Sequence, residues 1–286
     1  MTMGGIILDS SIWKKLVGEF VGCWLLGFLG LMCVAVAIVV GGFDLLGVGF
    51  AFAFAITFSV YLSGAVSGAH LNPAVTLGLA LFGGFPKKDV IPYWIAQILG
   101  WCVGALFLYM IVGGMITAYE ATNNIVRGSM ESQITAMIFN CYAPHPAFAA
   151  LNNWDASVMP TWKAIISEMF GTMMLVTLVF AFIDENNPFR PSAGLFAVVV
   201  GLAVGYIILV TSPQTMAAIN PARDLGPRIA TWLLGWGKAA FPGPPSGLGG
   251  PWYIFTVGPL LGGIIGGGLW KLVLLPLIPK KSAEES

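Results

Sequence analysis

The most distinctive polar residues of this sequence belong to one tripeptide, Asn-Pro-Ala, which occurs twice within long apolar stretches. The first copy is Asn72, Pro73 and Ala74, and the second is Asn220, Pro221 and Ala222. Asn favours the N-cap of a helix, and Pro favours the first helical turn, where its missing N–H would have had no partner. Each tripeptide is therefore predicted to begin a helix. A single copy would need no further explanation, but two copies indicate a site built from both.

The chemistry of such a site would be electrostatic. The N-terminus of a helix carries roughly half a positive charge, and an Asn amide offers N–H donors. Two helix N-termini that meet, together with two Asn amides, would repel a cation or a hydrated proton and admit a neutral hydroxyl. Gly68, Ala69 and His70 precede the first tripeptide as irregular sequence at membrane depth. Such backbone is tolerated where it lines a water-filled passage, so we expect these three residues to line one.

Composition indicates that membrane helices position this site. The 286 residues are 57% hydrophobic and 9% charged, whereas a soluble domain carries about 25% charged residues. The formal net charge is zero, which gives no reason to expect a nucleic-acid partner. The four cysteines form no C-x-x-C pair, so neither a metal site nor a disulfide framework is expected. Lipid is the expected solvent, and the predicted fold class is an all-α membrane protein.

Six apolar runs are long enough to span a bilayer, which takes about 20 helical residues. They lie at about 13–40, 46–64, 90–113, 162–183, 191–209 and 252–275. Two shorter runs, at about 75–82 and 220–233, adjoin the two tripeptides and predict re-entrant half-helices. The long polar connection at 116–160 is expected to lie, partly ordered, over the mouth of the passage.

Lys and Arg residues gather on one predicted side of the membrane. If the N-terminus is inside, the inner flanks hold Lys14, Lys15, Lys87, Lys88, Arg190, Lys271, Lys280 and Lys281. Outside the half-helix, the opposite side holds only Arg127, Lys163 and Lys238. Because short cytoplasmic loops carry an excess of basic residues, this bias predicts a multi-pass cell-membrane protein with both termini in the cytoplasm.

The two halves of the sequence repeat one another. Trp, Lys, Glu and Gly recur at one spacing, as Trp13, Lys14, Glu19 and Gly22 and again as Trp162, Lys163, Glu168 and Gly171. The offset of the Glu pair is 168 − 19 = 149, and that of the two Asn residues is 220 − 72 = 148. Three spans per half is an odd number, so an inverted 3+3 repeat is predicted. The expected organisation is a first repeat at 1–115, an extracellular loop at 116–160 and a second repeat at 161–286.

The residues around both tripeptides resemble the two signature loops of the major intrinsic protein family, the aquaporins and aquaglyceroporins. The resemblance rests on Ser-Gly-Ala-His-Leu-Asn-Pro-Ala-Val-Thr at 67–76 and on Asn-Pro-Ala-Arg-Asp-Leu-Gly-Pro-Arg at 220–228. It implies six tilted transmembrane helices and two half-helices that form one pore per subunit, in a homotetramer. It also implies that Glu19, Glu168 and Asp224 support the loops.

The resemblance further implies a selectivity filter at Phe52, Ile208, Ala217 and Arg223. An Arg within a membrane segment is functional by default, although a structural pair with Asp224 stays open. Strict water channels resemble each other in carrying a His at the position of Ile208, so this filter is similar to that of the glycerol-conducting branch. Ala217 stands where well-known glycerol facilitators carry a second aromatic residue. The constriction is therefore expected to be wider than theirs.

These features predict a passive channel for glycerol, water and other small uncharged solutes that excludes protons and ions. Lactic acid, urea or dihydroxyacetone stay open as the main solute. Two alternative classes are a secondary transporter coupled to protons through Glu19 or Glu168, and a structural junction protein with a closed pore. The sequence shows no nucleophile–base pair, phosphate loop or metal cluster, so neither an enzyme nor a cofactor is expected. His145, in the long loop, carries no functional signal.

Overall fold

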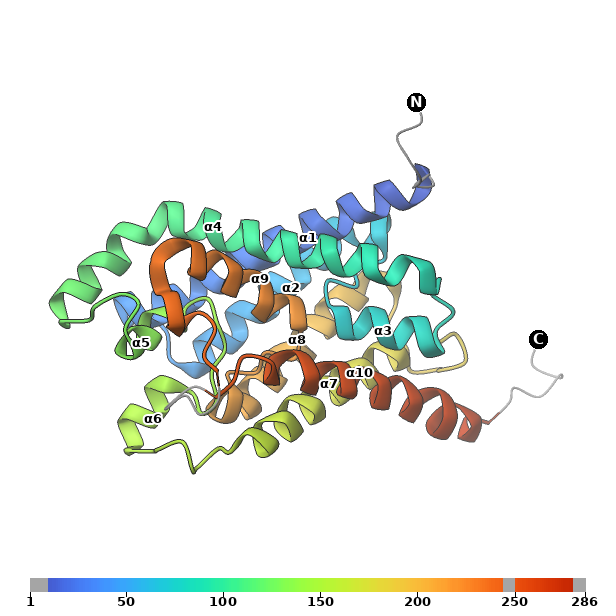
Figure 1. Ribbon diagram of the computed structural model, residues 1–286. Helices are drawn as coiled ribbons and strands as arrows, with labels where there is room; N and C mark the ends of the chain where they lie inside the picture. Colours follow the sequence, from blue (N-terminus) through green and yellow to red (C-terminus); the bar gives the residue numbers. More distant parts are fainter. Residues whose placement is uncertain (1–9, 244–249, 280–286) are drawn as a thin grey trace.

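The computed structural model describes residues 10–243 and 250–279, and its regular elements are all helices (Figure 1). Six of them are long and apolar enough to cross a membrane. They are built on α1 (Ser10–Ala35), α2 (Leu45–Ser67), α4 (Val90–Thr122), α7 (Thr161–Ile183), α8 (Ala193–Thr215) and α10 (Ile254–Gly268), and the sixth span continues beyond α10 to Leu277. Two short helices, α3 (Pro73–Phe82) and α9 (Pro221–Thr231), begin at the two tripeptides. The predicted fold class of six spans and two half-helices is confirmed.

Shorter elements continue or connect these helices. The π-helical turns η1 (Val36–Val40) and η6 (Leu269–Leu274) extend α1 and α10, and η7 (Leu275–Leu277) follows η6. The turns η4 (Trp232–Trp236) and η5 (Gly237–Ala239) follow α9, and η2 (Lys87–Asp89) precedes α4. The connection between α4 and α7 holds η3 (Met130–Ser132), α5 (Gln133–Ala136) and α6 (Pro146–Asn152). The long polar loop is therefore ordered over much of its length.

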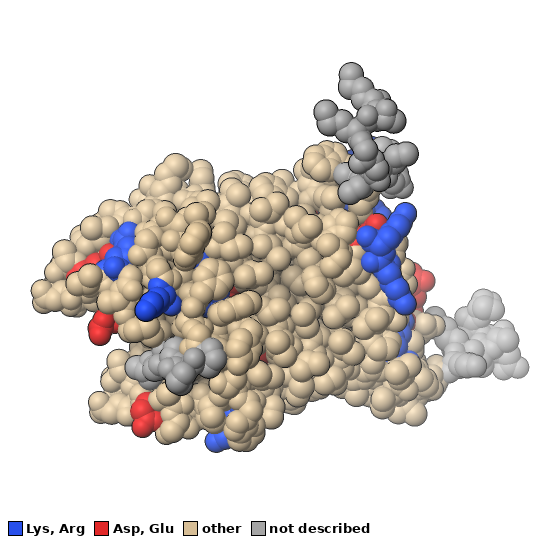
Figure 2. Space-filling view, viewed as in Figure 1, with Lys and Arg blue, Asp and Glu red and all other residues tan. Residues whose placement is uncertain are grey.

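The bundle has two distinct ends (Figure 1). We call one the basic end, because α1 and η2 begin there with Lys14, Lys15, Lys87 and Lys88. We call the other the loop end, because α5 and α6 lie there. In Figure 2 nearly all visible charged side chains gather at the two ends, and a broad uncharged band lies between them. Such a band is what the hydrocarbon core of a bilayer requires.

The helices pack in the pattern of an inverted repeat. In the first half α1 packs on α2 and α4, and in the second half α7 packs on α8 and α10. The two halves meet where α2 packs on α8. Each half-helix crosses to the other half, because α3 packs on α10 and α9 packs on α4. Neither half-helix is therefore covered by its own repeat alone.

Glycines allow the closest of these approaches. A Cβ atom on Gly262 of α10 would lie 2.3 Å from the carbonyl oxygen of Met169 on α7. One on Gly263 would lie 2.4 Å from the carbonyl oxygen of Ala74 on α3. Only a residue without a side chain permits backbones to come this near, as in other membrane bundles.

Two helices are longer than their apolar runs predict. α4 continues to Thr122, which is 122 − 113 = 9 residues beyond the expected end. Its last turn carries Glu120, which is buried and bound by Arg127 at 2.7 Å, so the helix leaves the apolar band and enters the folded loop. α8 continues to Thr215 through Pro213, which lies in its final turn. Hydropathy marks the limits of the apolar band and not those of the helix.

Candidate functional site

The two half-helices begin at the middle of the bundle and are joined through their Asn caps. The Nδ2 atom of Asn72 donates to the carbonyl oxygen of Ile219 at 2.9 Å, and that of Asn220 donates to the carbonyl oxygen of Leu71 at 2.8 Å. Each side-chain oxygen accepts from the backbone N–H two residues further on, at 2.9 and 3.0 Å. Each Asn therefore caps its own helix and holds the loop of the opposite half.

The two loops before these caps follow the same backbone path. Positive φ angles occur at Gly68 (87°), Ala69 (48°) and Leu71 (53°), and again at Met216 (60°), Ala217 (52°) and Ile219 (42°). Each pair is offset by 148, as 216 − 68, 217 − 69 and 219 − 71 all show. An L-residue in this region costs about 1–2 kcal/mol. The irregular backbone is thus a repeated and strained feature that other contacts must hold.

Two buried carboxylates make those contacts. Glu19 accepts from the N–H groups of His70 and Leu71 at 2.9 and 2.8 Å. Glu168 accepts from the corresponding two N–H groups of the second loop at 2.9 and 2.6 Å. Both side chains are fully buried. Each carboxylate binds its loop with both oxygens, and Glu19 also accepts from Gln97 at 2.7 Å.

A cavity of about 1040 Å³ extends along the bundle, with walls formed by residues from both ends. Of the predicted site residues, it is bordered by Phe52, Gly68, Ala69, His70, Asn72, Ile208, Ala217, Asn220 and Arg223. The others lie behind this wall: Glu19, Pro73, Ala74, Glu168, Pro221, Ala222 and Asp224. The structure thus brings the Asn of each tripeptide, the predicted lining residues and the filter residues to one cavity, with the Pro and Ala of each tripeptide and the loop-supporting residues outside it.

Most of the cavity wall is apolar. Towards the basic end it is formed by Val60, Val75, Leu79, Leu175 and Val179. His70 lies among aromatic side chains there, with its ring 4.7 Å from that of Phe85, and its Nδ1 atom is 3.1 Å from the Oγ1 atom of Thr76. Near the two Asn caps the polar groups come from the two loops, while Asp44, His145 and Ser212 border the cavity elsewhere. The cavity therefore has one apolar side and one polar side.

Of the four predicted filter residues in this wall, Arg223 is the charged one. Its Nη1 atom donates to the carbonyl oxygen of Phe139 at 2.7 Å, and its Cζ atom lies 5.7 Å from the centre of the Phe52 ring. Phe52 reaches this place because position 30 is Gly, where a Cβ atom would lie 2.6 Å from the ring. Ile208 and Ala217 are buried and border the same cavity.

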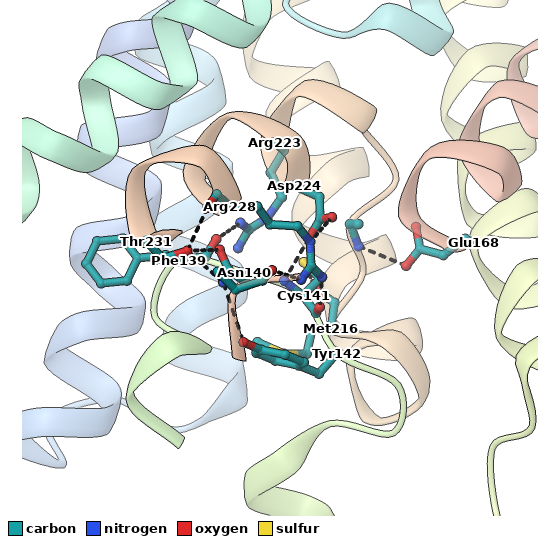
Figure 3. A network of polar contacts seen from close by, with 12 residues as sticks. Phe139, Asn140, Cys141, Tyr142, Glu168, Met216, Arg223, Asp224, Arg228 and Thr231 are labelled. Atoms are coloured by element: carbon teal, nitrogen blue, oxygen red, sulfur yellow. Dashed lines mark hydrogen bonds and ion pairs between the residues drawn. The ribbon is translucent and has the colours of Figure 1, made fainter. Parts of the chain in front are cut away.

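Behind Arg223 a second Arg organises the long loop (Figure 3). Asp224 does not pair with Arg223: its carboxylate accepts from the Nε atom of Arg228 at 2.5 Å and from the N–H of Cys141 at 2.9 Å. Arg228, fully buried, also donates to the carbonyl oxygens of Ala240 and Cys141. No role for Arg228 was predicted from the sequence. Its four-residue spacing from Asp224 within a membrane helix was the available signal.

The long loop brings His145 to the cavity at the loop end. Its backbone N–H donates to the carbonyl oxygen of Pro213 at 3.3 Å, and its ring lies 4.5 Å from that of Phe148. Both side chains border the cavity. Burial lowers the pKa of His145 to about 4, so the ring is neutral at pH 7. Sequence reasoning missed this position because nothing local shows how the loop folds back.

Comparison with known proteins decides the family. The model of the major intrinsic protein family matches residues 7–270. The chain belongs to the major intrinsic protein family. The glycerol uptake facilitator of Escherichia coli K12 is 35% identical over 268 residues, covering 93% of this chain and 89% of that protein. The propanediol uptake facilitator PduF of Salmonella typhimurium is 36% identical over 279 residues, covering 97% and 100%.

A solved structure points to the same branch of the family. The X-ray structure of the aquaglyceroporin from Plasmodium falciparum matches with a TM-score of 0.77 and 25% identity, over 93% of this chain and 98% of that one. The predicted resemblance to the aquaglyceroporin branch is confirmed. Members of the family are channels or facilitators, so the chain is a passive channel for small solutes in a membrane and not an enzyme.

Proposed function

We propose that the chain conducts glycerol, water and other small uncharged solutes and excludes protons and ions. The observation that carries the proposal is the reciprocal hydrogen bonding of Asn72 and Asn220 at the cavity wall. An amide has two N–H donors, and one from each Asn is used for the opposite loop. Among the described residues the second has no acceptor, so it can donate to the oxygen of a passing solute.

Electrostatics supports the exclusion of cations. Two helix N-termini, each with roughly half a positive charge, face the same part of the cavity, and the Arg223 guanidinium adds a full charge near them. A proton or metal ion would meet this positive field with little water around it. A neutral polyol or a water molecule is not repelled by this field, and its oxygens can accept hydrogen bonds from the donors there.

The two-sided wall supports polyols as the main solutes. A polyol has carbons on one edge and hydroxyls on the other, and the cavity presents an apolar side and a donor-rich side. The names of the relatives, glycerol uptake facilitator and propanediol uptake facilitator, fit this class of solute. Lactic acid, urea and dihydroxyacetone belong to the same size range, and the test below includes lactic acid and urea.

We assign Glu19 and Glu168 to holding the loops and not to proton coupling. All four carboxylate oxygens already accept backbone N–H groups, and neither side chain borders the cavity. A coupling carboxylate needs access to the solute path and a proton to exchange. Asp224 has the equivalent supporting role for the long loop, through the N–H of Cys141.

We also propose a homotetramer in the cell membrane, with the basic end in the cytoplasm. The basic end carries Lys14, Lys15, Lys87 and Lys88, which supports this orientation. The family supports the tetramer. The two repeats, at 1–115 and 161–286, would each contribute one half of every pore.

The decisive experiment is stopped-flow light scattering of proteoliposomes challenged with glycerol, propanediol, urea, lactic acid at low pH, and a non-permeant osmolyte for water. We expect glycerol and propanediol to enter faster than into protein-free vesicles, without accumulating above the outside concentration. An Ala217→Trp variant, which fills the predicted filter, is the matched control and is expected to block both. Swelling at the background rate for all solutes would refute the proposal, and accumulation against a gradient would indicate a transporter.

A further inference from the structure

Arg223 lies beside a second aromatic side chain that comes from outside the predicted filter. Its Cζ atom is 5.8 Å from the ring centre of Trp101 on α4, nearly the same as its 5.7 Å distance from Phe52 on α2. A cation within about 6 Å of an aromatic face is attracted to it. Two helices therefore each present a ring to the one guanidinium.

Trp101 reaches this position through a niche between three helices. A Cβ atom on Gly27 of α1 would lie 3.2 Å from its indole ring, and one on Gly226 of α9 would lie 2.8 Å from its Cβ atom. The side chain is 1% exposed and borders the cavity. Two glycines on two neighbouring helices thus make room for the largest type of side chain next to Arg223.

The indole N–H of Trp101 argues against a purely structural role. It is buried and has no acceptor among the described residues. Trp94, Trp236 and Trp270 all donate to protein oxygens, at 3.1, 3.1 and 2.9 Å. A buried indole usually finds such a partner, and a Leu or Phe would fill the same niche without burying an unpaired donor. What distinguishes Trp101 from other fillers is its large ring beside the guanidinium.

We propose that Trp101 is a positioning and specificity-determining residue of this pore. It supplies the second aromatic wall that Ala217 does not, and it holds the Arg223 guanidinium from α4. The Trp101 ring on α4 would thereby narrow the constriction that Ala217 leaves wide. This inference rests on the proposed function, because it concerns which solutes pass the filter.

The test compares three variants in proteoliposomes. Trp101→Leu keeps an apolar side chain but removes the ring, Trp101→Phe keeps a ring, and Trp24→Leu is the matched control. Trp24 packs on Phe107 at a ring distance of 5.8 Å and does not border the cavity. Two readouts are measured: the permeability of a four-carbon polyol relative to glycerol, and proton leak under an imposed membrane potential. Both report the filter, whereas a loss of folded protein would lower all rates together.

For Trp101→Leu we expect the polyol ratio and the proton leak each to rise roughly two- to tenfold, the change that one lost cation–π contact gives. Trp101→Phe and Trp24→Leu should stay near the wild-type values. Unchanged ratio and leak in Trp101→Leu, or an equal change in Trp24→Leu, would overturn the inference. If Trp101→Leu does not fold, a Trp101→Met variant replaces it under the same criteria. A wild-type protein that conducts no glycerol would instead refute the proposed function.

Discussion

Replacing Glu168 with Gln tests how the strained second loop is held. The loop has three L-residues at positive φ, Met216, Ala217 and Ile219, which together cost about 3–6 kcal/mol. The carboxylate offsets this with two charge-assisted hydrogen bonds, worth about 1.5–3 kcal/mol each. The cost of the strained backbone and the stabilisation by the two hydrogen bonds are thus of similar size. Removing one of these bonds is therefore expected to loosen the loop, which Asn72 also holds through the carbonyl oxygen of Ile219.

Gln has the same shape as Glu but only one acceptor oxygen. One of the two backbone N–H groups would then face an NH2 group, which leaves a buried donor unpaired at a cost of about 1–3 kcal/mol. The other bond loses its charge assistance, about 1 kcal/mol. We expect Glu168→Gln to lower the free energy of unfolding by about 2–4 kcal/mol. It should also slow glycerol entry, because Ile219 in this loop binds Asn72.

The assay is thermal unfolding in detergent followed by Trp fluorescence, with solute entry measured in proteoliposomes. A loss of this size corresponds to an apparent Tm about 4–10 °C lower. Glu185→Gln is the matched control, because the Glu185 side chain is 87% exposed. Its ion pair is long, with 3.7 Å between its Oε1 atom and the Nη1 atom of Arg190. This substitution should leave both quantities unchanged. A Glu168→Gln protein with wild-type Tm and wild-type solute entry would refute the reasoning, and Glu19→Gln should repeat the effect in the first loop.

Three further substitutions probe the filter and the basic end. Arg223→Val should raise proton leak by at least about tenfold while water still passes, since it removes the full charge near the helix ends; a dye-based proton flux assay with no change would exclude that role. Ala217→Phe should reduce the entry of four-carbon polyols relative to glycerol by roughly threefold or more; equal entry would place the constriction elsewhere. Burial alone would raise the pKa of Asp184, but hydrogen bonds from Lys271 and Trp270 hold that pKa below its ordinary value of 3.8. Because the pKa is lower in the folded state, the stabilisation is fully present above about pH 4 and is lost only as the pH falls further, towards the lowered pKa of the folded state. Asp184→Asn should therefore lower the apparent Tm at pH 7 by a few degrees, and this difference should shrink progressively as the pH is lowered below about 4; a difference independent of pH would contradict this.

The sequence is most informative where the relevant chemistry is local. An Asn cap followed by Pro predicts a helix start from neighbouring residues alone, and both starts lie where expected. The repeat offset of 148 between Asn72 and Asn220 recurs in the φ angles of the preceding loops. The number of spans also follows from local composition, because each must be apolar over its whole length.

The sequence is least informative about which faces of the helices meet. A membrane helix is apolar all round, so the usual periodicity does not show which side faces the cavity. Phe52 and Ile208 were placed only through the family resemblance. Trp101, Arg228 and His145 were missed because each depends on a contact between segments far apart in the chain. Such contacts leave no mark in the local sequence beyond the four-residue spacing of Asp224 and Arg228.

The crossing of the half-helices sets the order in which the pore can be completed during synthesis. α3 ends at Phe82, yet it packs against α10, which begins 254 − 82 = 172 residues later in the chain. The first half must therefore wait in the bilayer with one flank of α3 uncovered until α10 inserts. A chain that stops before Ile254 would keep Asn72 and its loop but lack the helix that backs them. Completion of the conduit is thus coupled to the synthesis and insertion of α10.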